Sequence, residues 1–391
     1  MKRIFNTLGR CALAIGLLAG CVGAPLWAAT ITVTSTADTG AGSLRQALLD
    51  AAAGDTIDFN LVYPALIYPQ TTLYISKNVM IAGPGAANLI LDGNNAGYPM
   101  IQFPVAATAT ISGLTMQHAG ASAIHLPQGT LTVNQCAFLN NLGSAIISSG
   151  SLTVNDSVFT DNASGNLGGA IYSNAAASIN RSSFMGNTAS SGGGAIVTFG
   201  GMGIHYCTFS GNQTLGNNSS RGGAISAGGT LLIDTSTFNA NTARGFGGAI
   251  HNEGTLTLTG STLAGNVSLL AGNGINTFSS LTISRSILDG CNGTVTSAGD
   301  NIGNDGSCVT TSAILNDRAN LDALLVGLAN NGGPTKTMAL QTASPAIDQV
   351  TINTAACTGT DQRGVTRPAG LRCDTGAVEM VSDTLFRNDF E

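Results

Sequence analysis

Charged residues are scarce in this sequence, and lysine is the scarcest of them. Asp, Glu, Lys and Arg together make up 9% of the chain, against roughly a quarter of an average globular domain. Lysine occurs only at Lys2, Lys77 and Lys336, and the formal net charge is −6. The sequence has no basic cluster of the kind that binds phosphate backbones, so we expect no nucleic-acid partner.

Long apolar runs are also missing beyond the first residues. No later stretch has the ~20 apolar residues of a membrane helix, so we expect no transmembrane span after signal removal. At the start, Lys2, Arg3 and Arg10 precede an apolar run over residues 11–20, and a small-residue cleavage site follows at Ala28 and Ala29. This order is typical of a secretory signal peptide, and we interpret residues 1–29 as one.

Cys21 leaves a second interpretation of this segment open. It ends the sequence Leu-Ala-Gly-Cys, which resembles the bacterial lipoprotein box, in which the cysteine carries the lipid. The expected location is therefore extracellular or on the outer-membrane surface of a Gram-negative bacterium, with a lipoprotein anchored at Cys21 as the alternative.

Six of the eight cysteines lie beyond the signal segment. Four of them form two closely spaced pairs, each around a polar loop. In an oxidising compartment this spacing predicts local disulfides Cys291–Cys308 and Cys357–Cys373. Cys136 and Cys207 each lie two residues before a phenylalanine of a repeat, and we expect both to be unpaired side chains inside a stack. No cysteine or histidine spacing is typical of a zinc site.

Glycine is abundant, at 52 residues, and three short motifs recur together about every 25 residues. The first is F-x-x-N, with Phe138, Phe159, Phe184, Phe209, Phe238 and Asn141, Asn162, Asn187, Asn212, Asn241. The second is G-G-A-I, beginning at Gly168, Gly193, Gly222 and Gly247. The third is a short alternating segment such as 131–133, 152–154, 231–233, 256–258 and 281–283.

Three short strands per repeat predict an all-β, single-stranded, right-handed parallel β-helix. Strands this short cannot bury a face alone, but stacked turns pair every backbone group with the next turn and bury a continuous core. Stacking also places like residues in columns. We expect a column of Val133, Val154, Ile179, Ile204, Ile233, Leu258 and Ile283, a column of the five phenylalanines, and the asparagines at a corner, bonded between turns. An outward column of Asn134, Asn155, Asn180, His205, Asp234, Thr259 and Ser284 is expected to be polar.

Exposed ends of a stack invite polymerisation and have to be covered. Residues 43–54 predict an amphipathic helix with Ser43 as N-cap and Gly54 after its end. We therefore expect an N-terminal helical cap with the first turns over residues 30–110 and repeats over 111–290. C-terminal turns and a disulfide-containing cap should follow over 291–380, and a tail over 381–391.

The paired F-x-x-N and G-G-A-I motifs resemble the repeats of chlamydial polymorphic membrane proteins. Residues 42–47 are similar to the C-S-L-R-E-A motif of secreted β-helix proteins, although Gly42 replaces the cysteine and Gln46 the glutamate. Segments 331–335, 344–348, 361–364 and 374–379 resemble the choice-of-anchor Q domain. Together these resemblances imply a pectin-lyase-like fold. Residues 381–391 are similar to a short tail ending in Phe-Glu on some secreted bacterial proteins, and they carry no strand pattern like the terminal barrel of the chlamydial proteins.

The sequence shows no obvious catalytic cluster. Glycoside hydrolases need two carboxylates within several ångströms, and aligning the repeats places no two acids in one column on adjacent turns. Asp156 aligns with Arg181 on the next turn, and these two are the weak candidates for a lyase-type site, with a surface ion pair as the simpler interpretation. The histidines are expected at the surface, and His125 and His251, five turns apart, are too far from each other to share a metal; the other two are His118 and His205.

The C-terminal acids Asp348, Asp361, Asp374 and Glu379 lie among Arg363, Arg367 and Arg372. We interpret them as pairs that hold the closing loops together, with a Ca²⁺ site as the alternative. Otherwise no cofactor or metal is expected.

The leading functional hypothesis is a non-catalytic secreted or cell-surface β-helix protein with an adhesive or structural role. Two alternatives are a polysaccharide lyase or hydrolase and a carbohydrate-binding accessory protein. The expected partners are a polysaccharide or the surface of a host or neighbouring cell, and we expect a monomer.

Overall fold

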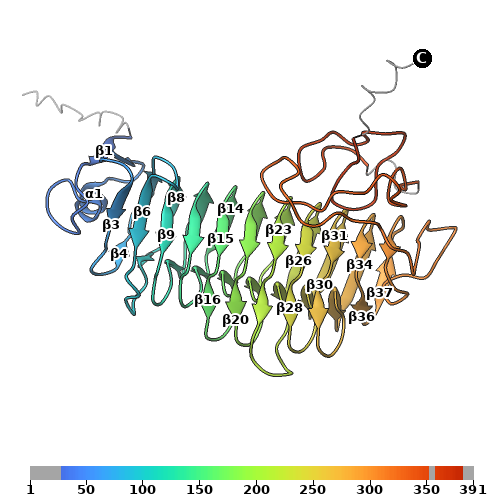
Figure 1. The fold of residues 1–391 in the computed structure, drawn as a ribbon. Coiled ribbons are helices and arrows are strands. Elements are labelled where there is room, and N and C mark those ends of the chain that lie inside the picture. Colours follow the sequence, from blue (N-terminus) through green and yellow to red (C-terminus); the bar gives the residue numbers. More distant parts are fainter. Residues whose placement is uncertain (1–27, 352–356, 382–391) are drawn as a thin grey trace, which may run out of the picture.

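The computed structural model describes residues 28–351 and 357–381, and within them the chain winds into an elongated stack of parallel strands (Figure 1). The expectations for the signal segment, Cys21 and the Phe-Glu tail lie outside the described residues. Each of the four sheets runs along the stack, and every strand pair within them is parallel. The all-β parallel β-helix predicted from the repeats is thus confirmed.

Two sheets carry the alternating and the F-x-x-N segments. The twelve-stranded sheet contains β1 (Thr30–Val33), β2 (Thr56–Phe59), β5 (Val79–Ala82), β8 (Thr108–Ser112), β11 (Thr130–Asn134), β14 (Ser151–Asn155), β18 (Ala177–Asn180), β22 (Met202–His205), β26 (Thr230–Asp234), β30 (Thr255–Thr259), β34 (Ser280–Ser284) and β37 (Val295–Ser297). The eleven-stranded sheet contains β3 (Ala65–Ile67), β6 (Leu89–Asp92), β9 (Thr115–Gln117), β12 (Ala137–Leu139), β15 (Val158–Thr160), β19 (Ser183–Met185), β23 (Thr208–Ser210), β27 (Thr237–Asn239), β31 (Thr262–Ala264), β35 (Ile287–Leu288) and β38 (Ile302–Gly303).

The remaining sheets hold the G-G-A-I segments and a corner. The ten-stranded sheet contains β4 (Leu73–Tyr74), β7 (Ile101–Gln102), β10 (Ile124–Leu126), β13 (Ile146–Ser148), β17 (Ile171–Ser173), β21 (Ile196–Thr198), β25 (Ile225–Ala227), β29 (Ile250–Asn252), β33 (Ile275–Thr277) and β36 (Cys291–Asn292). The five-stranded sheet contains β16 (Ala163–Ser164), β20 (Thr188–Ala189), β24 (Gln213–Thr214), β28 (Thr242–Ala243) and β32 (Val267–Ser268). This fourth sheet was not predicted, because two-residue strands are too short to show alternation.

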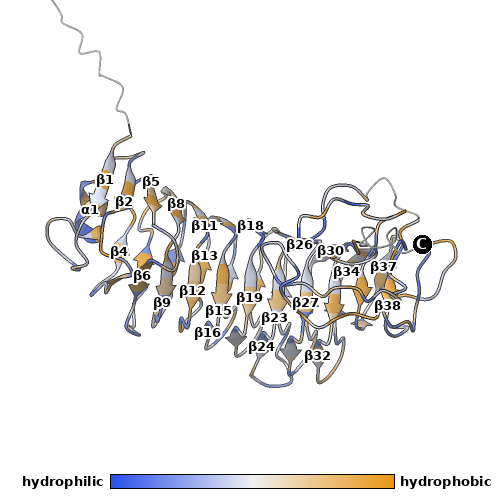
Figure 2. Ribbon diagram, turned by 45° about the horizontal axis from the view of Figure 1, so that its top comes forward, coloured by the Kyte–Doolittle hydropathy of each residue, from blue (hydrophilic) through white to orange (hydrophobic). Residues whose placement is uncertain are grey.

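The core consists of the predicted columns. The register of the twelve-stranded sheet aligns Val133 with Val154 and continues without a slip to Ile283. The five phenylalanine rings are fully buried and stack with centroids 4.6–4.8 Å apart and planes within 4–6°. Figure 2 shows apolar residues that recur on successive strands along the stack. The turns are therefore locked in register by side chains as well as by backbone hydrogen bonds.

Asparagines of the F-x-x-N motif form a buried, one-directional ladder. Asn162 shows the pattern: its backbone N–H and Nδ2 both donate to Oδ1 of Asn187 on the next turn, and Nδ2 also donates to the carbonyl of Phe138. The side-chain steps from Asn141 to Asn266 measure 2.8–2.9 Å. Each amide thus satisfies backbone groups that the sharp corner would otherwise leave unpaired.

A second ladder runs two residues before the phenylalanines, through Ser and Cys. Its members are Cys136, Ser157, Ser182, Cys207, Ser236, Ser261 and Ser286. Each Ser Oγ accepts a backbone N–H from the preceding turn, as Ser157 does from Cys136. Both cysteines are buried and free, as expected for members of the stack.

The N-terminal end is covered by α1 (Leu44–Asp50), whose Leu44, Ala47 and Leu48 are buried. Ser43 is the N-cap, and its Oγ accepts from the backbone N–H of Gln46. The helix ends at Asp50 with Ala51 as its C-cap, earlier than the predicted Gly54, and Lys77 Nζ donates to the carbonyls of Leu49 and Ala51. A cation at a helix C-terminus also complements the helix dipole.

Cys291–Cys308 and Cys357–Cys373 are disulfide-bonded, with Cα separations of 4.8 and 6.1 Å. The first pair lies at the far end of the stack. Residues 321–351 and 357–381, here called the C-terminal strap, contain no helix or strand and fold back along the side of the solenoid beside the eleven-stranded sheet (Figure 1). The strap therefore covers a lateral face in addition to following the end of the stack.

Candidate functional site

Gln362 fixes the C-terminal strap to the side of the solenoid. Its side chain is almost fully buried. Nε2 donates to the carbonyl of Cys207 (3.0 Å) and to Oγ1 of Thr208 (2.9 Å), and Oε1 accepts from Oγ1 of Thr237 (2.7 Å). One buried amide thus bonds β23 and β27 together with the strap, so the strap has a defined position on the wall.

A cleft of about 180 Å³ lies where the strap meets the wall. Its lining residues are Arg181, Tyr206, Pro334, Thr360, Asp361, Gln362, Arg363 and Gly364. The cleft brings the sequence candidate Arg181 beside strap residues more than 150 positions away. The strap is not part of the repeats, so the sequence analysis did not predict that its residues meet Arg181.

Asp156 and Arg181 meet on adjacent turns as the alignment predicted. The guanidinium makes two bonds of 2.7 Å to the carboxylate, from Nε to Oδ1 and from Nη2 to Oδ2. The side chain of Arg181 is 46% exposed and that of Asp156 is 31% exposed. The hydrogen bonds to Asp156 raise the pKa of Arg181. A guanidinium held in its charged form by a bidentate partner is poorly suited to accept a proton as a lyase base.

The strap carboxylates are occupied by internal hydrogen bonds. Asp361 Oδ1 accepts the backbone N–H groups of Arg363 and Val365, while its Oδ2 accepts the Arg363 guanidinium and the N–H of Glu379. Glu379 in turn accepts from Arg367. Five N–H donors on one buried carboxylate fasten a loop, and they leave little capacity for a substrate.

The other strap acids follow the same pattern. Asp374 accepts the backbone N–H groups of Asp348 and Met380, and Asp348 accepts that of Arg372. Burial raises the pKa of Asp374 to about 6. Across the described residues, no group of three His, Cys, Asp or Glu side chains is placed to hold a metal ion.

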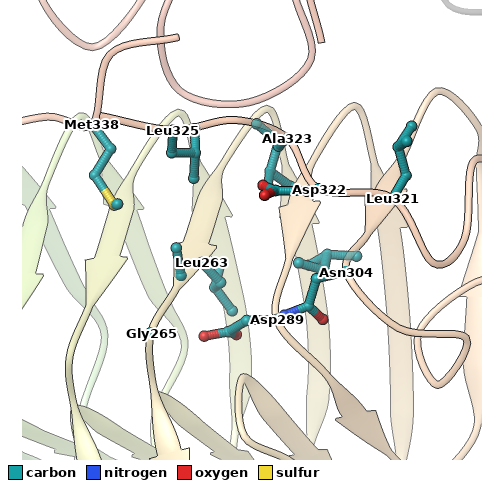
Figure 3. Close-up of a pocket in the computed structure, with 12 residues that line it drawn as sticks. Leu263, Gly265, Asp289, Asn304, Leu321, Asp322, Ala323, Leu325 and Met338 are labelled. Carbon is teal, nitrogen blue, oxygen red and sulfur yellow. The ribbon is translucent and has the colours of Figure 1, made fainter. Parts of the chain in front are cut away.

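A second cavity of about 200 Å³ lies under the strap nearer the end of the stack (Figure 3). Its lining is mostly apolar, with Leu263, Leu321, Leu325 and Met338 among the residues drawn. Asp289 also lines it. The carboxylate of Asp289 ends the asparagine ladder, because Oδ2 accepts both the backbone N–H and Nδ2 of Asn266. Burial raises its pKa to about 6, and Oδ1 is buried without a hydrogen-bond partner.

His251 corrects the expectation that the four histidines lie at the surface. Its side chain has no exposed area, because the rings of Phe246 and Phe278 cover it. Nε2 lies 3.4 Å from Glu253 Oε1, and Nδ1 lies 3.0 Å from Nδ2 of Asn276. Burial lowers its pKa. The alignment missed this burial because the covering rings come from other columns, Phe246 on the same turn and Phe278 on the next.

The register of the twelve-stranded sheet aligns the outward residues into one polar column. Asn155 Nδ2 donates to Asn134 Oδ1, and Asn180 Nδ2 donates to Asn155 Oδ1. The amides therefore bond to one another along the stack. The three side chains are half-buried members of a regular polar column.

Sequence comparison identifies the repeat and structural comparison identifies the fold. Residues 156–174, 181–198 and 235–253 match the Chlamydia polymorphic membrane protein repeat. Among curated proteins, none matches the sequence. The solved structure of pectate lyase Pel9A is similar over 90% of this chain and 96% of its own, with 14% identity and a TM-score of 0.54.

Two alginate lyases also match, at lower similarity. The PL6 family enzyme AlyGC is 11% identical, over 80% of this chain and 56% of its own, with a TM-score of 0.37. AlyF-OU02, in complex with G6, is 12% identical, over 80% and 90%, with a TM-score of 0.31. The similarity to pectate lyase Pel9A, at 14% identity, shows a shared fold and carries no activity with it. Among the described residues, no helix has the length and apolar character to cross a membrane. The chain is a parallel β-helix that carries copies of the Chlamydia polymorphic membrane protein repeat.

Proposed function

We propose that this chain is a non-catalytic secreted or cell-surface protein that acts by adhesion or as a structural β-helix. The observation that carries the proposal is the state of the acids in the strap and at the cleft beside Arg181. The acids of the strap are bound by backbone N–H groups or by arginine, and Asp156 is bound by Arg181. A hydrolase needs one carboxylate free to donate a proton and a second free to act as base or nucleophile.

The shape of the molecule supports the same proposal. Turn after turn, the outward column of the twelve-stranded sheet presents a polar side chain, and two hydrogen-bonded ladders run along the stack. Repeat proteins use such extended surfaces to bind extended partners. The matched repeat bears the name of membrane proteins, which supports a location at the cell surface.

The proposed location is the exterior or the outer-membrane surface of a Gram-negative bacterium, reached through the signal peptide at residues 1–29. Intact mass of the protein recovered from its native host tests this proposal. The mass of a mature chain that begins at or near Ala29 would agree with ordinary cleavage. A mass that includes a diacylglycerol on Cys21 would establish the lipoprotein alternative.

A second candidate function, a polysaccharide lyase or carbohydrate-binding accessory protein, is favoured by the cleft at Arg181. There Arg181, Arg363 and Tyr206 line one cavity beside the strap, and cationic and aromatic groups together suit an acidic sugar. The bidentate partner of each arginine argues for binding over proton transfer.

A depolymerisation screen separates a polysaccharide lyase from a non-catalytic protein. Purified protein is incubated with polygalacturonate, alginate and neutral polysaccharides, with and without Ca²⁺, while reducing ends and unsaturated-uronate absorbance are followed. We expect no turnover on any substrate, with binding to intact cells or to polysaccharide in a pull-down. Turnover of any substrate would refute the non-catalytic proposal, and turnover that disappears in Arg181→Ala but persists in the control Arg244→Ala would locate the site at the cleft.

A further inference from the structure

Two exposed phenylalanines lie in one column on the outside of the ten-stranded sheet. The residues that directly follow β21, β25, β29 and β33 are Phe199, Gly228, Glu253 and Phe278. The backbone N–H groups of the last three each donate to the preceding turn, so the column is regular. Neighbouring strands are ~4.8 Å apart, which separates the two phenylalanine positions by ~14 Å. Phe199 is 51% exposed and Phe278 is 62% exposed.

Each ring is supported from one side. The ring of Phe199 lies over Gly228, where an added Cβ would be 2.9 Å from Cδ1, and the ring of Tyr172 lies 6.0 Å away at 63°. Phe278 is supported by Phe246 at 5.9 Å and by His251 at 5.2 Å. The rings are therefore held in place while a large part of each remains open to solvent.

The surface between the two rings is polar but electrically balanced. Arg221 pairs with Glu253, and these side chains are 43% and 41% exposed. His251 shares the same Glu253 oxygen. The ion pair leaves no net charge in the patch, and the whole chain carries a net charge of −6. A polyanion would therefore gain no attraction from this face.

We propose that this column, together with Arg221, is a binding subsite for a neutral oligosaccharide. The inference rests on the proposed binding function and names the ligand class of one surface. Sugar rings present apolar C–H faces, which pack on aromatic rings, and hydroxyl edges, which bond both to guanidinium donors and to carboxylate acceptors. A protein partner would need about 800 Å² on each side, whereas this patch has two rings and one ion pair. The patch therefore fits a short length of glycan that spans the two rings.

The test measures binding of defined neutral hexasaccharides by titration calorimetry. The probes are cellohexaose, xylohexaose and mannohexaose, with hexagalacturonate as the acidic comparison. We expect at least one neutral probe to bind. Phe199→Ala and Phe278→Ala should each weaken its binding about tenfold, because each removes a supported stacking face.

Two further variants make the test specific. Tyr74→Ala removes an aromatic side chain that is 55% exposed in β4 of the same sheet but far along the stack, and it should keep the wild-type affinity. Gly228→Ala leaves both aromatic rings in the chain but displaces the ring of Phe199, and it should weaken binding severalfold. Circular dichroism and melting curves verify that each variant is folded.

The outcomes separate this inference from the function on which it rests. The inference is overturned if no neutral probe binds, if hexagalacturonate binds more tightly than all of them, or if the phenylalanine variants bind like Tyr74→Ala. In those cases, retained binding to cells would leave the proposed adhesive function intact. Conversely, turnover of a polysaccharide would remove the non-catalytic proposal, while the phenylalanine variants would still decide whether this subsite exists.

Discussion

Asp289 should make the protein less stable as the pH rises, and Asp289→Asn should remove this effect. The carboxylate is buried at the end of the asparagine ladder, and burial raises its pKa to about 6, above the ~3.9 of an unfolded aspartate. Between these two pH values the folded chain holds a proton that the unfolded chain has lost. Stability therefore falls as the pH rises from ~4 to ~6 and is constant above that range.

The magnitude follows from the two pKa values. A difference of about 2 pKa units at 1.36 kcal/mol each corresponds to about 3 kcal/mol of lost stability at pH 7.5. Asparagine at this position is neutral, has the same shape and can accept both donors of Asn266 with its Oδ1. Its Nδ2 would replace a carboxylate oxygen that has no partner, so part of the gain is offset by a buried unpaired N–H. We expect Asp289→Asn to stabilise the folded state by about 1–3 kcal/mol at pH 7.5.

The assay is urea denaturation followed by circular dichroism at pH 4, 5, 6 and 7.5. The gap between Asp289→Asn and wild type should be small at pH 4 and should grow to its full size above pH 6. Asp161→Asn is the matched control, because Asp161 lies at an exposed corner of another turn. A gap that is independent of pH, or an Asp289→Asn variant less stable than wild type at pH 7.5, would refute the reasoning.

Other substitutions test the stack itself. Phe184→Ala should cost about 3–5 kcal/mol by opening a cavity in the ring stack, whereas Phe184→Leu should cost much less, since Leu263 occupies the same column; denaturation midpoints measure both. Asn212→Ala should cost about 3 kcal/mol in the same assay, because it removes two accepted and two donated bonds at once. Burial raises the pKa of the Cys207 thiol to about 12, so this thiol should not react with a chromogenic thiol reagent until the protein unfolds. The absorbance of the chromophore that the reagent releases measures the reaction. Arg181→Ala should change the unfolding free energy by less than about 1 kcal/mol, since its ion pair is exposed.

The repeats allowed most of the fold to be predicted. The phenylalanine and asparagine columns recur at a nearly constant step, so one alignment of the turns aligns every buried column and pairs Asp156 with Arg181. The Ser and Cys column was visible in the same alignment two residues before each phenylalanine, and its role was missed for the serines because serine is common on exposed surfaces.

The position of the C-terminal strap could not be predicted from the repeats. Gln362 reaches the carbonyl of Cys207 across 155 residues, and no periodicity connects the two. The same limit applies to His251, which is buried by rings that protrude from other columns. Alignment specifies which residues share a column, but it does not specify which side chains bend across to cover a neighbouring column.

Ladder polarity explains why the last turns depart from the repeat. Every asparagine donates its backbone N–H and Nδ2 toward the C-terminal end, so the final member has to accept two hydrogen bonds. A carboxylate accepts without needing an acceptor of its own, and Asp289 holds this place for Asn266. The second ladder ends in the same way: Ser286 donates to Asn301, whose N–H and Nδ2 donate to Asp317. Leu288 takes the place of the motif's phenylalanine, so F-x-x-N spacing would put the asparagine at position 291. Asp289 lies two residues earlier, which is why the repeat pattern did not predict its place in the ladder. Both one-directional ladders therefore end on an aspartate, which accepts the last two hydrogen bonds and needs no further turn to donate to.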